Sequence, residues 1–500
     1  MEAITAAFGL IFDTQVLLTI LASAAFGIVV GAVPGLTATM AVALLVPVTF
    51  FMPPVPALAA IVTTTAMAIF AGDIPATLLR MPGTPASAAY ADEGFAMTRK
   101  GQAELALGAN VVFSALGGLF GTAVLILAAP ALADLALGFS SFEYFWLACL
   151  GLTCGVFIAS RTPLKALVSL LLGLMVSTVG FDAISGFPRF SFGVTDLMGG
   201  VSFIPAMIGL FAVSEVLRGM ADPGGQPMLA QGRIGNIFRG LGPLVLRYWP
   251  NMLRGNILGT VIGALPGAGA DIAAWVSYAV SRRFSKEPEK FGTGHVEGII
   301  DATSANNAAL GGAWIPALVF GIPGDSITAI VIGVLYMKGM NPGPTVFVQN
   351  PQLIYAVFIA FIVANILMVP LGLLAIRGSS FILRVPRKVL LPIILLFCIV
   401  GSFAITSSPF GVMIMLVAGI VGWIMEENGI PIAPAILGLV LGELLEQTFM
   451  TSMIKAQGDL LAFFDRPLSI VLGSLTLLIW AMAIGGAVWK AVQARAEARA

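Results

Sequence analysis

The sequence is short of charged side chains. They make up 10% of its 500 residues, whereas a soluble domain carries about 25%. Apolar residues make up 58%, more than a water-soluble protein of this length can bury, and they recur in runs near the ~20 residues that cross a bilayer. The runs are continuous and do not alternate with polar residues, as the strands of a membrane β-barrel would. We therefore expect an all-α polytopic integral membrane protein.

Histidine and cysteine are also scarce, with one histidine and three cysteines in the chain. His295 lies in the polar segment FGTGHVEG, where we expect a solvated ring, and the cysteines lie in apolar runs that indicate no pairing. The sequence has no Cys/His metal cluster, phosphate-binding loop or nucleophile elbow. We therefore expect no enzyme activity, no catalytic residue and no cofactor. Basic and acidic side chains balance at 25 each, and we expect no nucleic-acid partner.

Basic residues are missing from the N-terminus, MEAITAAFGLIFDTQ, and gather in separate loops. Without a basic region the N-terminus does not resemble a signal peptide, so the first apolar run should be retained. The positive-inside rule places the basic loops in the cytoplasm, which puts the N-terminus outside and the C-terminus inside. These loops are residues 99–100, 161–165, 218–254, 282–290, 377–388 and 490–499.

The apolar runs between these loops predict the spans, because each run connects a basic loop to a sparsely basic one. Together with the regions 31–100 and 263–344 they give about 11–12 membrane segments. The expected spans are Leu105–Ala129, Phe145–Ile158, Ala166–Phe181, Val201–Val216, Leu353–Ile376, Val389–Ile405, Gly411–Met425, Ile430–Leu445 and Leu468–Val488.

Two short phrases occur twice, in the same order, in the two halves of the chain. GAVPG at Gly31–Gly35 returns as GALPG at Gly263–Gly267, and IPATLLRMPG at Ile74–Gly83 returns as IPALVFGIPG at Ile315–Gly324. The flanking charges make the first region run from outside to inside and the second from inside to outside, which is the pattern of an inverted-topology repeat. Chance recurrence in a chain with 57 glycines and 30 prolines is the alternative.

The repeat predicts how the chain is divided. Residues 1–218 form the first repeat, with the motif region 31–100 and four spans, and residues 219–254 form a basic cytoplasmic connector. Residues 255–447 form the second, inverted repeat, with the motif region 263–344 and four spans. Residues 448–500 supply an extra C-terminal span and a cytoplasmic tail.

Each phrase should break its helix, because proline removes a backbone donor and glycine loosens the backbone. Near Pro266, basic residues stand at both ends of one apolar stretch, Arg254 to Arg282, and two arms of ~12 residues at ~1.5 Å each are too short to cross ~30 Å. A re-entrant hairpin fits this pattern, and a single kinked span is the alternative. The predicted breaks are Pro34, Pro82, Gly83, Pro266, Pro323 and Gly324.

Broken helices in a membrane offer half-helix N-termini to anions and loose carbonyls to cations. We therefore expect the two IP…PG breaks to enclose a substrate, and the GxxPG breaks to hold a coupling ion, with no metal beyond a candidate Na⁺. Alternatives stay open: either asparagine can simply tie helices together, and Arg80 can pair with Asp73. The substrate ligands expected are Thr84, Ser87, Arg80, Asn306, Asn307 and Ser326, and the ion-coupling residues are Gly35, Thr37, Gly267 and Asp271.

Four long segments resemble a known family: GAVPGLTATMAVALLVPVTF, IPATLLRMPGTPASAAYADEGFAMTRKGQAELALG, GALPGAGADIAAW and ANNAALGGAWIPALVFGIPGDSITAIVIGVLYMKGMNPGP. They are similar to the large membrane subunit of tripartite tricarboxylate transporters, over nearly the whole chain. The resemblance implies a bacterial inner-membrane permease, a symporter that imports a tricarboxylate- or dicarboxylate-like solute on a Na⁺ or H⁺ gradient. It implies a small four-helix membrane subunit and a periplasmic solute-binding protein as partners, besides membrane lipid.

Other functional classes predict different sequence features. An ion-coupled carboxylate carrier or channel that works without a binding protein is the alternative. A channel would need a continuous polar path, whereas paired interruptions of apolar segments favour occlusion. A membrane-embedded hydrolase would need a nucleophile and a base, and the sequence groups none together. One departure from the family is Asp73 with Arg80, where smaller or neutral polar residues are expected in many relatives, which leaves citrate itself in question as substrate.

Overall fold

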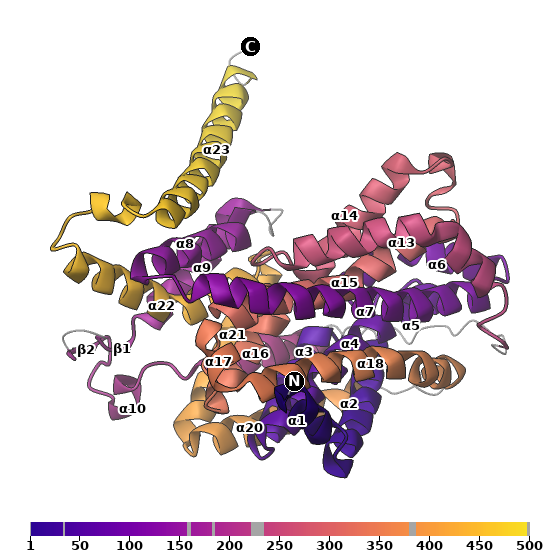
Figure 1. Ribbon diagram of the computed structural model, residues 1–500, viewed down its shortest axis with the longest axis horizontal. Coiled ribbons are helices and arrows are strands. Elements are labelled where there is room, and N and C mark those ends of the chain that lie inside the picture. Colours follow the sequence, from indigo (N-terminus) through magenta and orange to yellow (C-terminus); the bar gives the residue numbers. More distant parts are fainter. Residues whose placement is uncertain are drawn as a thin grey trace. The chain divides into compact units, whose positions relative to one another are not determined.

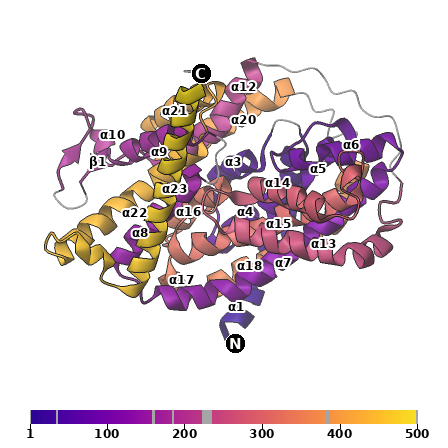
Figure 2. The same ribbon diagram turned by 90° about the horizontal axis from the view of Figure 1, so that it is seen from above.

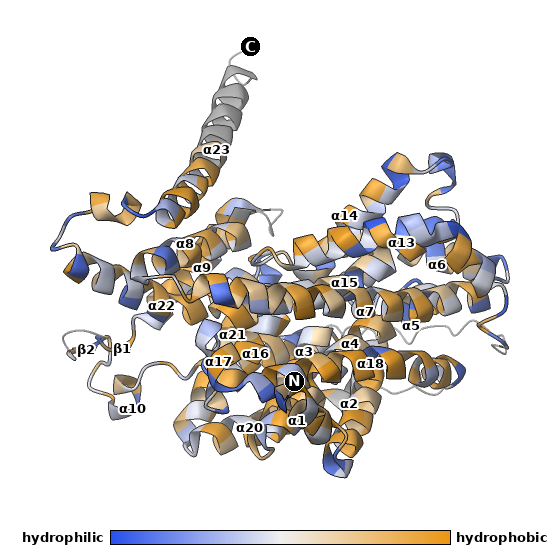
Figure 3. Ribbon diagram, viewed as in Figure 1, coloured by the Kyte–Doolittle hydropathy of each residue, from blue (hydrophilic) through white to orange (hydrophobic). Residues whose placement is uncertain are grey.

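The computed structural model describes residues 2–33, 36–157, 162–182, 186–221, 235–379 and 387–497, and there it is almost wholly helical (Figure 1). Seven of the described helices are long and apolar enough to cross a membrane. Within the same residues the only sheet pairs two short antiparallel strands, β1 (Gly180–Phe181) and β2 (Pro188–Arg189). The expected all-helical membrane fold is confirmed. Figure 3 shows hydrophobic residues along most helices and hydrophilic ones gathered in the connections between them.

The chain forms two compact units. The first consists of Met1–Asp134 with Ser202–Asn428, and the second of Leu135–Val201 with Gly429–Ala500. Each unit takes segments from both halves of the sequence. The division into 1–218, 219–254, 255–447 and 448–500 follows the repeated phrases instead, and it stays a prediction.

The first motif region folds into helices that begin at a capping side chain or a proline. The Asp13 carboxylate accepts a hydrogen bond from the backbone of Gln15 at 2.8 Å, and the Thr37 hydroxyl accepts one from Met40 at 3.2 Å. Pro54 opens the next helix, where a missing N–H costs nothing. The elements are α1 (Glu2–Ile11), α2 (Thr14–Ala32), α3 (Ala38–Phe50), α4 (Pro54–Ala71), α5 (Asp73–Leu79), η1 (Ser87–Ala89) and α6 (Ala91–Arg99).

The second motif region is built around a helix buried on all sides, α15, which is apolar or small-residue along nearly its whole surface. The helices before it, α13 and α14, pack on each other and on α15 (Figures 1 and 2). The first arm of the predicted hairpin is longer than expected, because helix α13 begins well before Arg254 and bends at Tyr248, ahead of Pro250. The elements are α13 (Leu241–Gly263), α14 (Gly269–Phe284), η3 (Pro288–Lys290), α15 (Val296–Phe320) and α16 (Ser326–Met337).

The remaining helices carry the predicted spans. In the first unit they are α7 (Ala103–Ala136), which continues into the second unit, α11 (Phe203–Ile208), η2 (Gly209–Val213), α12 (Ser214–Ala221), α17 (Pro344–Gln349), α18 (Pro351–Arg377), α20 (Arg387–Thr406) and α21 (Pro409–Glu427). The second unit contains α8 (Ser141–Phe157), α9 (Pro163–Ser177), α10 (Thr195–Met198), α22 (Ala433–Lys455), η4 (Leu461–Phe464) and α23 (Pro467–Glu497).

Two predicted spans are corrected by the structure. The span expected at Ala166–Phe181 is too long, since its helix ends at Ser177 and Gly180 takes a φ of 120°, which a helix does not allow. The span expected at Val201–Val216 changes geometry in its middle, where η2 is a π-helical turn. There the Ser214 hydroxyl donates back to the carbonyl of Leu210, a bond that bends helices.

Glycines let the paired helices of each motif region approach to backbone contact. A Cβ on Gly27 or Gly31 of α2 would lie 2.6 or 2.3 Å from a carbonyl oxygen of α4, at Thr64 and Ala68. On α13, a Cβ at Gly259 or Gly263 would lie 2.3 or 2.2 Å from the carbonyls of Ala305 and Ala309 of α15. These distances exclude any side chain, so the spacing of small residues determines how close the helices come.

The core also joins distant parts of the chain. Helix α7 packs on α15 through Gly117 and Gly121, which lie against the carbonyls of Ser304 and Ala308, while α18 packs on α4. The helical segment α11–η2–α12 packs on α20 and α21. Within the second unit, α22 packs on α8 and α9. The last helix of each predicted repeat therefore packs on helices of the other repeat.

Candidate functional site

The two phrases of each motif region lie against each other. A Cβ on Gly83 would lie 2.5 Å from the Gly31 carbonyl oxygen, and the Gly83 N–H donates to the Gly72 carbonyl at 3.1 Å. In the second region a Cβ on Gly324 would lie 2.8 Å from the Gly263 carbonyl oxygen. Both break glycines are needed for this close approach.

The second break is further closed by a bond between its two phrases. Gly267, which has a φ of 81°, donates its N–H to the Gly324 carbonyl at 2.8 Å. Pro266 and Pro323 lie in the non-helical turns on either side of this bond, as Pro82 does in the first region. The expected break at Pro34 and the expected ion-coupling residue Gly35 lie outside the described residues.

A reciprocal pair of hydrogen bonds follows each IP…PG break. Thr84 and Ser87 exchange hydrogen bonds at 3.2 Å, each side-chain oxygen accepting from the other residue's N–H. Asp325 and Thr328 do the same at 2.8 Å, where the bonds form the capping box of α16. This box satisfies N–H groups that the start of a helix leaves free. Ser87 is fully buried and also donates to the Thr84 carbonyl, so it shapes the turn, whereas Ser326 is half-buried.

The loop after the first break contacts the helix after the second GALPG break. The exposed Asp271 carboxylate accepts from the Ala86 N–H at 3.0 Å, and the Trp275 indole donates to the Pro85 carbonyl at 3.2 Å. Gly269, two residues before Asp271, lies so close to Asp325 that a Cβ on it would be 2.6 Å from the Cβ of Asp325. Breaks from both regions therefore meet at the N-terminus of α14. Thr37, half-buried, caps α3 on the other side of the first GAVPG break.

Asn306 and Asn307 lie in the middle of α15, both buried. Asn306 donates to the Tyr90 hydroxyl at 3.5 Å, while its carbonyl oxygen has no partner among the described residues. Neither end of the Asn307 amide has a partner there. Leaving a buried polar group unpaired costs about 1–3 kcal/mol, and a polar ligand would remove that cost. No hydrogen bond among the described residues therefore supports the alternative that Asn307 ties helices together.

Arg80 does not pair with Asp73, so that alternative is wrong. Helix α5 ends at Leu79 and Arg80 takes a left-handed φ of 58°, which turns its side chain away to Asp92 at 2.7 Å. The two side chains are 62% and 60% exposed, so the pair contributes about 0–1 kcal/mol and leaves Arg80 available to an anion. Asp73 instead accepts from the hydroxyls of Tyr90 at 2.5 Å and Thr303 at 3.1 Å.

Several polar residues of the core escaped the sequence analysis. Tyr90 and Thr303 bring the two motif regions together at Asp73. The buried Glu93 accepts hydrogen bonds from the backbone of Gly292, Gly294 and His295 and from the hydroxyl of Tyr278. The DEG sequence around Glu93 resembles any solvated helix start, so only the long-range contacts identify it.

The expectation of a solvated His295 is wrong. Its ring is nearly buried, packs edge-on against Phe291 and lies 3.2 Å from the Glu297 carboxylate. The segment is buried because its glycines wrap their N–H groups around Glu93. Nearby, the Arg254 guanidinium of α13 forms an ion pair at 2.5 Å with the buried carboxylate of Asp301 on α15. The negative charge of Asp301 is therefore balanced by a residue of the helix packed against α15.

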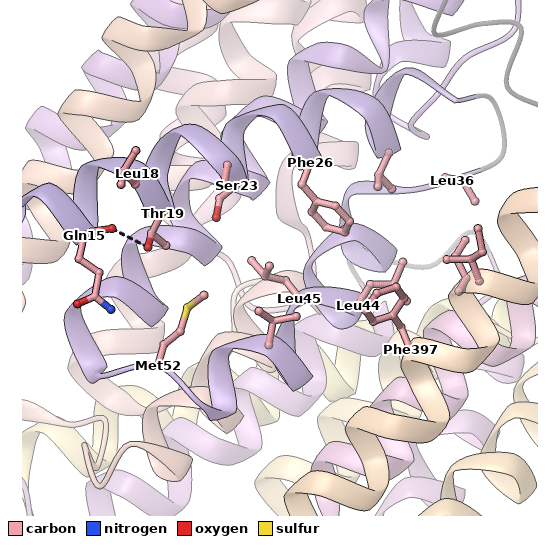
Figure 4. A pocket seen from close by; sticks show the side chains of 15 residues that line it. Gln15, Leu18, Thr19, Ser23, Phe26, Leu36, Leu44, Leu45, Met52 and Phe397 are labelled. Carbon is pink, nitrogen blue, oxygen red and sulfur yellow. Dashed lines mark hydrogen bonds between the residues drawn. The ribbon is translucent and has the colours of Figure 1, made fainter.

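Neither a metal cluster nor the apolar cavity between α2, α3 and α20 offers a competing site among the described residues. No group of three or more His, Cys, Asp or Glu among the described residues is placed to hold a metal ion. A cavity of about 550 Å³ lies between α2, α3 and α20 (Figure 4). Its walls are mostly apolar, with Leu18, Phe26, Leu44 and Phe397, and they carry no charged side chain. It lacks the counter-charge that a carboxylate needs.

Comparison with known proteins gives one family and two relatives. The sequence model described as the tripartite tricarboxylate transporter TctA family matches residues 17–437. An uncharacterized 52.8 kDa protein in the TAR-I ttuC' 3' region of Agrobacterium vitis is 36% identical over 450 residues, 89% of this chain and 88% of the relative. An uncharacterized protein in the TAR-II ttuC' 3' region of the same organism is 36% identical over 226 residues, 45% of this chain and 93% of the relative. No solved structure matches.

Proposed function

Because the chain belongs to the tripartite tricarboxylate transporter TctA family, whose members are membrane components of transporters and not enzymes, we propose that it imports a carboxylate solute on a sodium or proton gradient. The observation that carries the proposal is the meeting of broken helices from both motif regions, with buried amides left unpaired beside them. Transporters place substrate and ion sites where discontinuous helices meet. The solute class is tricarboxylate- or dicarboxylate-like.

An inverted repeat is part of this proposal. It is supported by equivalent packing at equivalent positions: Gly83 against the Gly31 carbonyl in one region, and Gly324 against the Gly263 carbonyl in the other. Each break is followed by a reciprocal pair of hydrogen bonds of the same spacing, Thr84 with Ser87 and Asp325 with Thr328. The exchange of the last helices between the halves also agrees with a pseudo-two-fold axis.

The substrate would bind between the two IP…PG breaks. Asn306, Asn307 and Ser326 would act from the second region, and Arg80 would supply the counter-charge. Thr84 and Ser87 would shape the turn at the site through their mutual hydrogen bonds. The Thr84 hydroxyl hydrogen is not used in these bonds and can donate to the substrate. An arginine releases a weak exposed partner at little cost when a carboxylate arrives.

The driving cation would bind at the GxxPG breaks. Gly35 and Gly267 would supply backbone carbonyl oxygens, and Thr37 and Asp271 would supply side-chain oxygens. Asp271 suits this role because it is exposed and holds one backbone N–H without a cationic partner among the described residues. Unwound backbone binds a hard cation without burying a full charge.

The family and the basic loops support a proposal for the partners and the orientation of the permease. A periplasmic solute-binding protein would deliver the carboxylate, and a small four-helix membrane subunit would assemble with this chain in a bacterial inner membrane. The N-terminus would lie in the periplasm and the C-terminus in the cytoplasm. A carrier or channel that works without a binding protein is the second candidate. It is favoured only if the rate of uptake does not depend on the binding protein.

Reconstituted uptake tests the function. Proteoliposomes that contain both membrane subunits should accumulate radiolabelled citrate, or a labelled dicarboxylate, only when the binding protein and an ion gradient are both present. Accumulation without the binding protein would indicate the second candidate. Downhill flux that does not saturate as the solute concentration rises, and that needs no ion gradient, would indicate a channel. The permease proposal would then be wrong.

A further inference from the structure

Asp73 is a fully buried carboxyl group without a cationic partner. It lies where α4 meets α5, and no lysine, arginine or histidine of the described residues forms an ion pair with it. Asp301 provides the contrast, because it is equally buried but is paired with Arg254. An unpaired charge in a membrane interior is costly and marks a functional group by default.

Hydroxyl groups connect Asp73 to both motif regions. Tyr90 donates to one carboxylate oxygen at 2.5 Å and Thr303 donates to the other at 3.1 Å. Thr303 is in turn 2.9 Å from the Ser114 hydroxyl of α7, and Tyr90 accepts from Asn306 at 3.5 Å. The chain of exchangeable hydrogens thus runs from Ser114 of α7 through Asp73 and Tyr90 to Asn306. Each carboxylate oxygen of Asp73 therefore accepts one hydroxyl donor, one from each motif region.

Asp73 is also coupled to the first break. Its neighbour Gly72 accepts the Gly83 N–H at 3.1 Å, and a Cβ on Gly83 would lie 2.6 Å from the Gly72 Cα. Asp73 is therefore one residue away from the backbone against which the break packs. Proline at position 75 stiffens the short helix α5 that connects the two.

The other charged groups on the elements around Asp73 are engaged elsewhere. Helices α2 and α4 carry none, Arg80 after α5 pairs with Asp92, and Glu93 of α6 binds backbone and Tyr278. On α15, Asp301 pairs with Arg254 and Glu297 contacts His295. Tyr90 is the titratable group in direct contact. The remaining charged residue on α6, Arg99, is exposed at its far end.

We propose that Asp73 binds and releases the coupling proton when a pH gradient drives transport, whereas the separate site at the exposed Asp271 would serve a metal cation. The inference rests on the proposed transport function. When a proton binds, an O–H bond forms on Asp73, which becomes neutral and donates to Thr303, while the Thr303 hydrogen turns toward Ser114. When the proton leaves to the other side of the membrane, the carboxylate again accepts from Tyr90 and Thr303. No oxidant, reductant or metal takes part.

The test compares two modes of transport in proteoliposomes of the complete tripartite system, with radiolabelled citrate or a labelled dicarboxylate as the probe. Uptake is measured on an imposed pH gradient without sodium, and exchange is measured with the same solute on both sides and no gradient. Asp73→Asn keeps the size and the acceptor oxygen but cannot carry a proton. We expect it to lose gradient-driven accumulation at least tenfold and to retain exchange. Asp134→Asn, an exposed aspartate on α7, should retain both.

The outcomes separate this inference from the proposed function. If the unaltered transporter shows neither uptake nor exchange of any carboxylate, the transport proposal fails. If the Asp73→Asn variant still accumulates solute on the pH gradient, or if only a sodium gradient drives the unaltered protein, the proton assignment is overturned. A second readout needs no substrate: the C=O band of a protonated carboxylic acid should appear on acidification in the infrared difference spectrum between the unaltered protein and the variant. A difference spectrum without that band would also overturn the assignment.

Discussion

Asn307 makes a prediction that separates binding from packing. Its amide has no partner among the described residues, so Asn307→Ala removes no hydrogen bond from the resting protein. Loss of a charge-assisted bond to a carboxylate should weaken affinity by about 1.5–3 kcal/mol, or roughly 10- to 150-fold, with no loss of thermal stability. Substrate titration of uptake and a melting curve of the purified protein measure the two effects.

Asn365 is a matched control on α18. It is equally buried, but its amide donates to the Phe361 carbonyl at 2.8 Å. Asn365→Ala should therefore lower stability and leave affinity unchanged. The binding role of Asn307 would be wrong if its alanine variant behaved like that of Asn365.

The Arg80–Asp92 pair allows a second prediction, because its two members can be removed separately. Arg80→Gln should depress uptake strongly, since it removes the counter-charge, while stability changes by about 0–1 kcal/mol for so exposed a pair. Asp92→Asn breaks the same pair but leaves Arg80 in place, and it should retain uptake. Uptake is measured at matched protein levels in the membrane. Equal loss of uptake in the two variants would mean that uptake requires the ion pair and that Arg80 is not a counter-charge for the substrate.

Residue types and short spacings could be predicted from the sequence, and long-range contacts could not. The positions of the breaks and the buried asparagines follow from Pro-Gly pairs and amides in apolar runs. The alternative of an Asp73–Arg80 pair requires both side chains on one face of a continuous helix, whereas α5 ends at Leu79 and Arg80 turns into the left-handed region. Contacts such as Thr303 with Asp73 join residues far apart in the chain and leave no local signal.

At the scale of elements, glycine spacing determines how α13 packs on α15. Gly259→Leu would place a side chain where a Cβ alone would be 2.3 Å from the Ala305 carbonyl, so the helices must separate. We expect a loss of stability of about 1–3 kcal/mol or more, as overpacking of a core costs. Gly242→Leu on the same helix is the control, since nothing lies within 4 Å of its Cβ position. Thermal melting in detergent should separate the two variants; equal melting temperatures would show that the close approach is not required.

The sequence predicted most helices because apolar runs of the right length leave few alternatives in a membrane. It missed the π-helical turn η2, since the deviation depends on how Gly209 lies against the Met415 carbonyl. It also missed β1 and β2, which depend on two residues each and on the φ of Gly180. Such features come from tertiary contacts and from single backbone angles, which hydropathy does not report.

At the scale of the whole molecule, the predicted hairpin makes a topological prediction. Arg239, before α13, and Glu289, after α14, are both exposed. In a variant whose native cysteines are replaced, Arg239→Cys and Glu289→Cys should both react with an impermeant thiol reagent only from the cytoplasmic side. Labelling of intact spheroplasts and of inverted vesicles compares the two sides. Reaction of the Glu289→Cys variant from the periplasm would mean that α13 and α14 form one kinked span.

The exchanged packing of the last helices has a consequence for synthesis. The segment α11–η2–α12 leaves the ribosome long before its packing partners α20 and α21, and α7 long before α15. Until those partners are inserted, the bilayer must hold helices whose glycine faces, and whose π-helical turn, contact lipid. During much of its synthesis, the nascent chain therefore contains inserted helices that have not yet met these partners. The packing of α7 on α15 and of α11–α12 on α20 and α21 forms late. A stop codon between α18 and α20 should leave α11–α12 without its contacts to α20 and α21 and expose the truncated chain to membrane proteases.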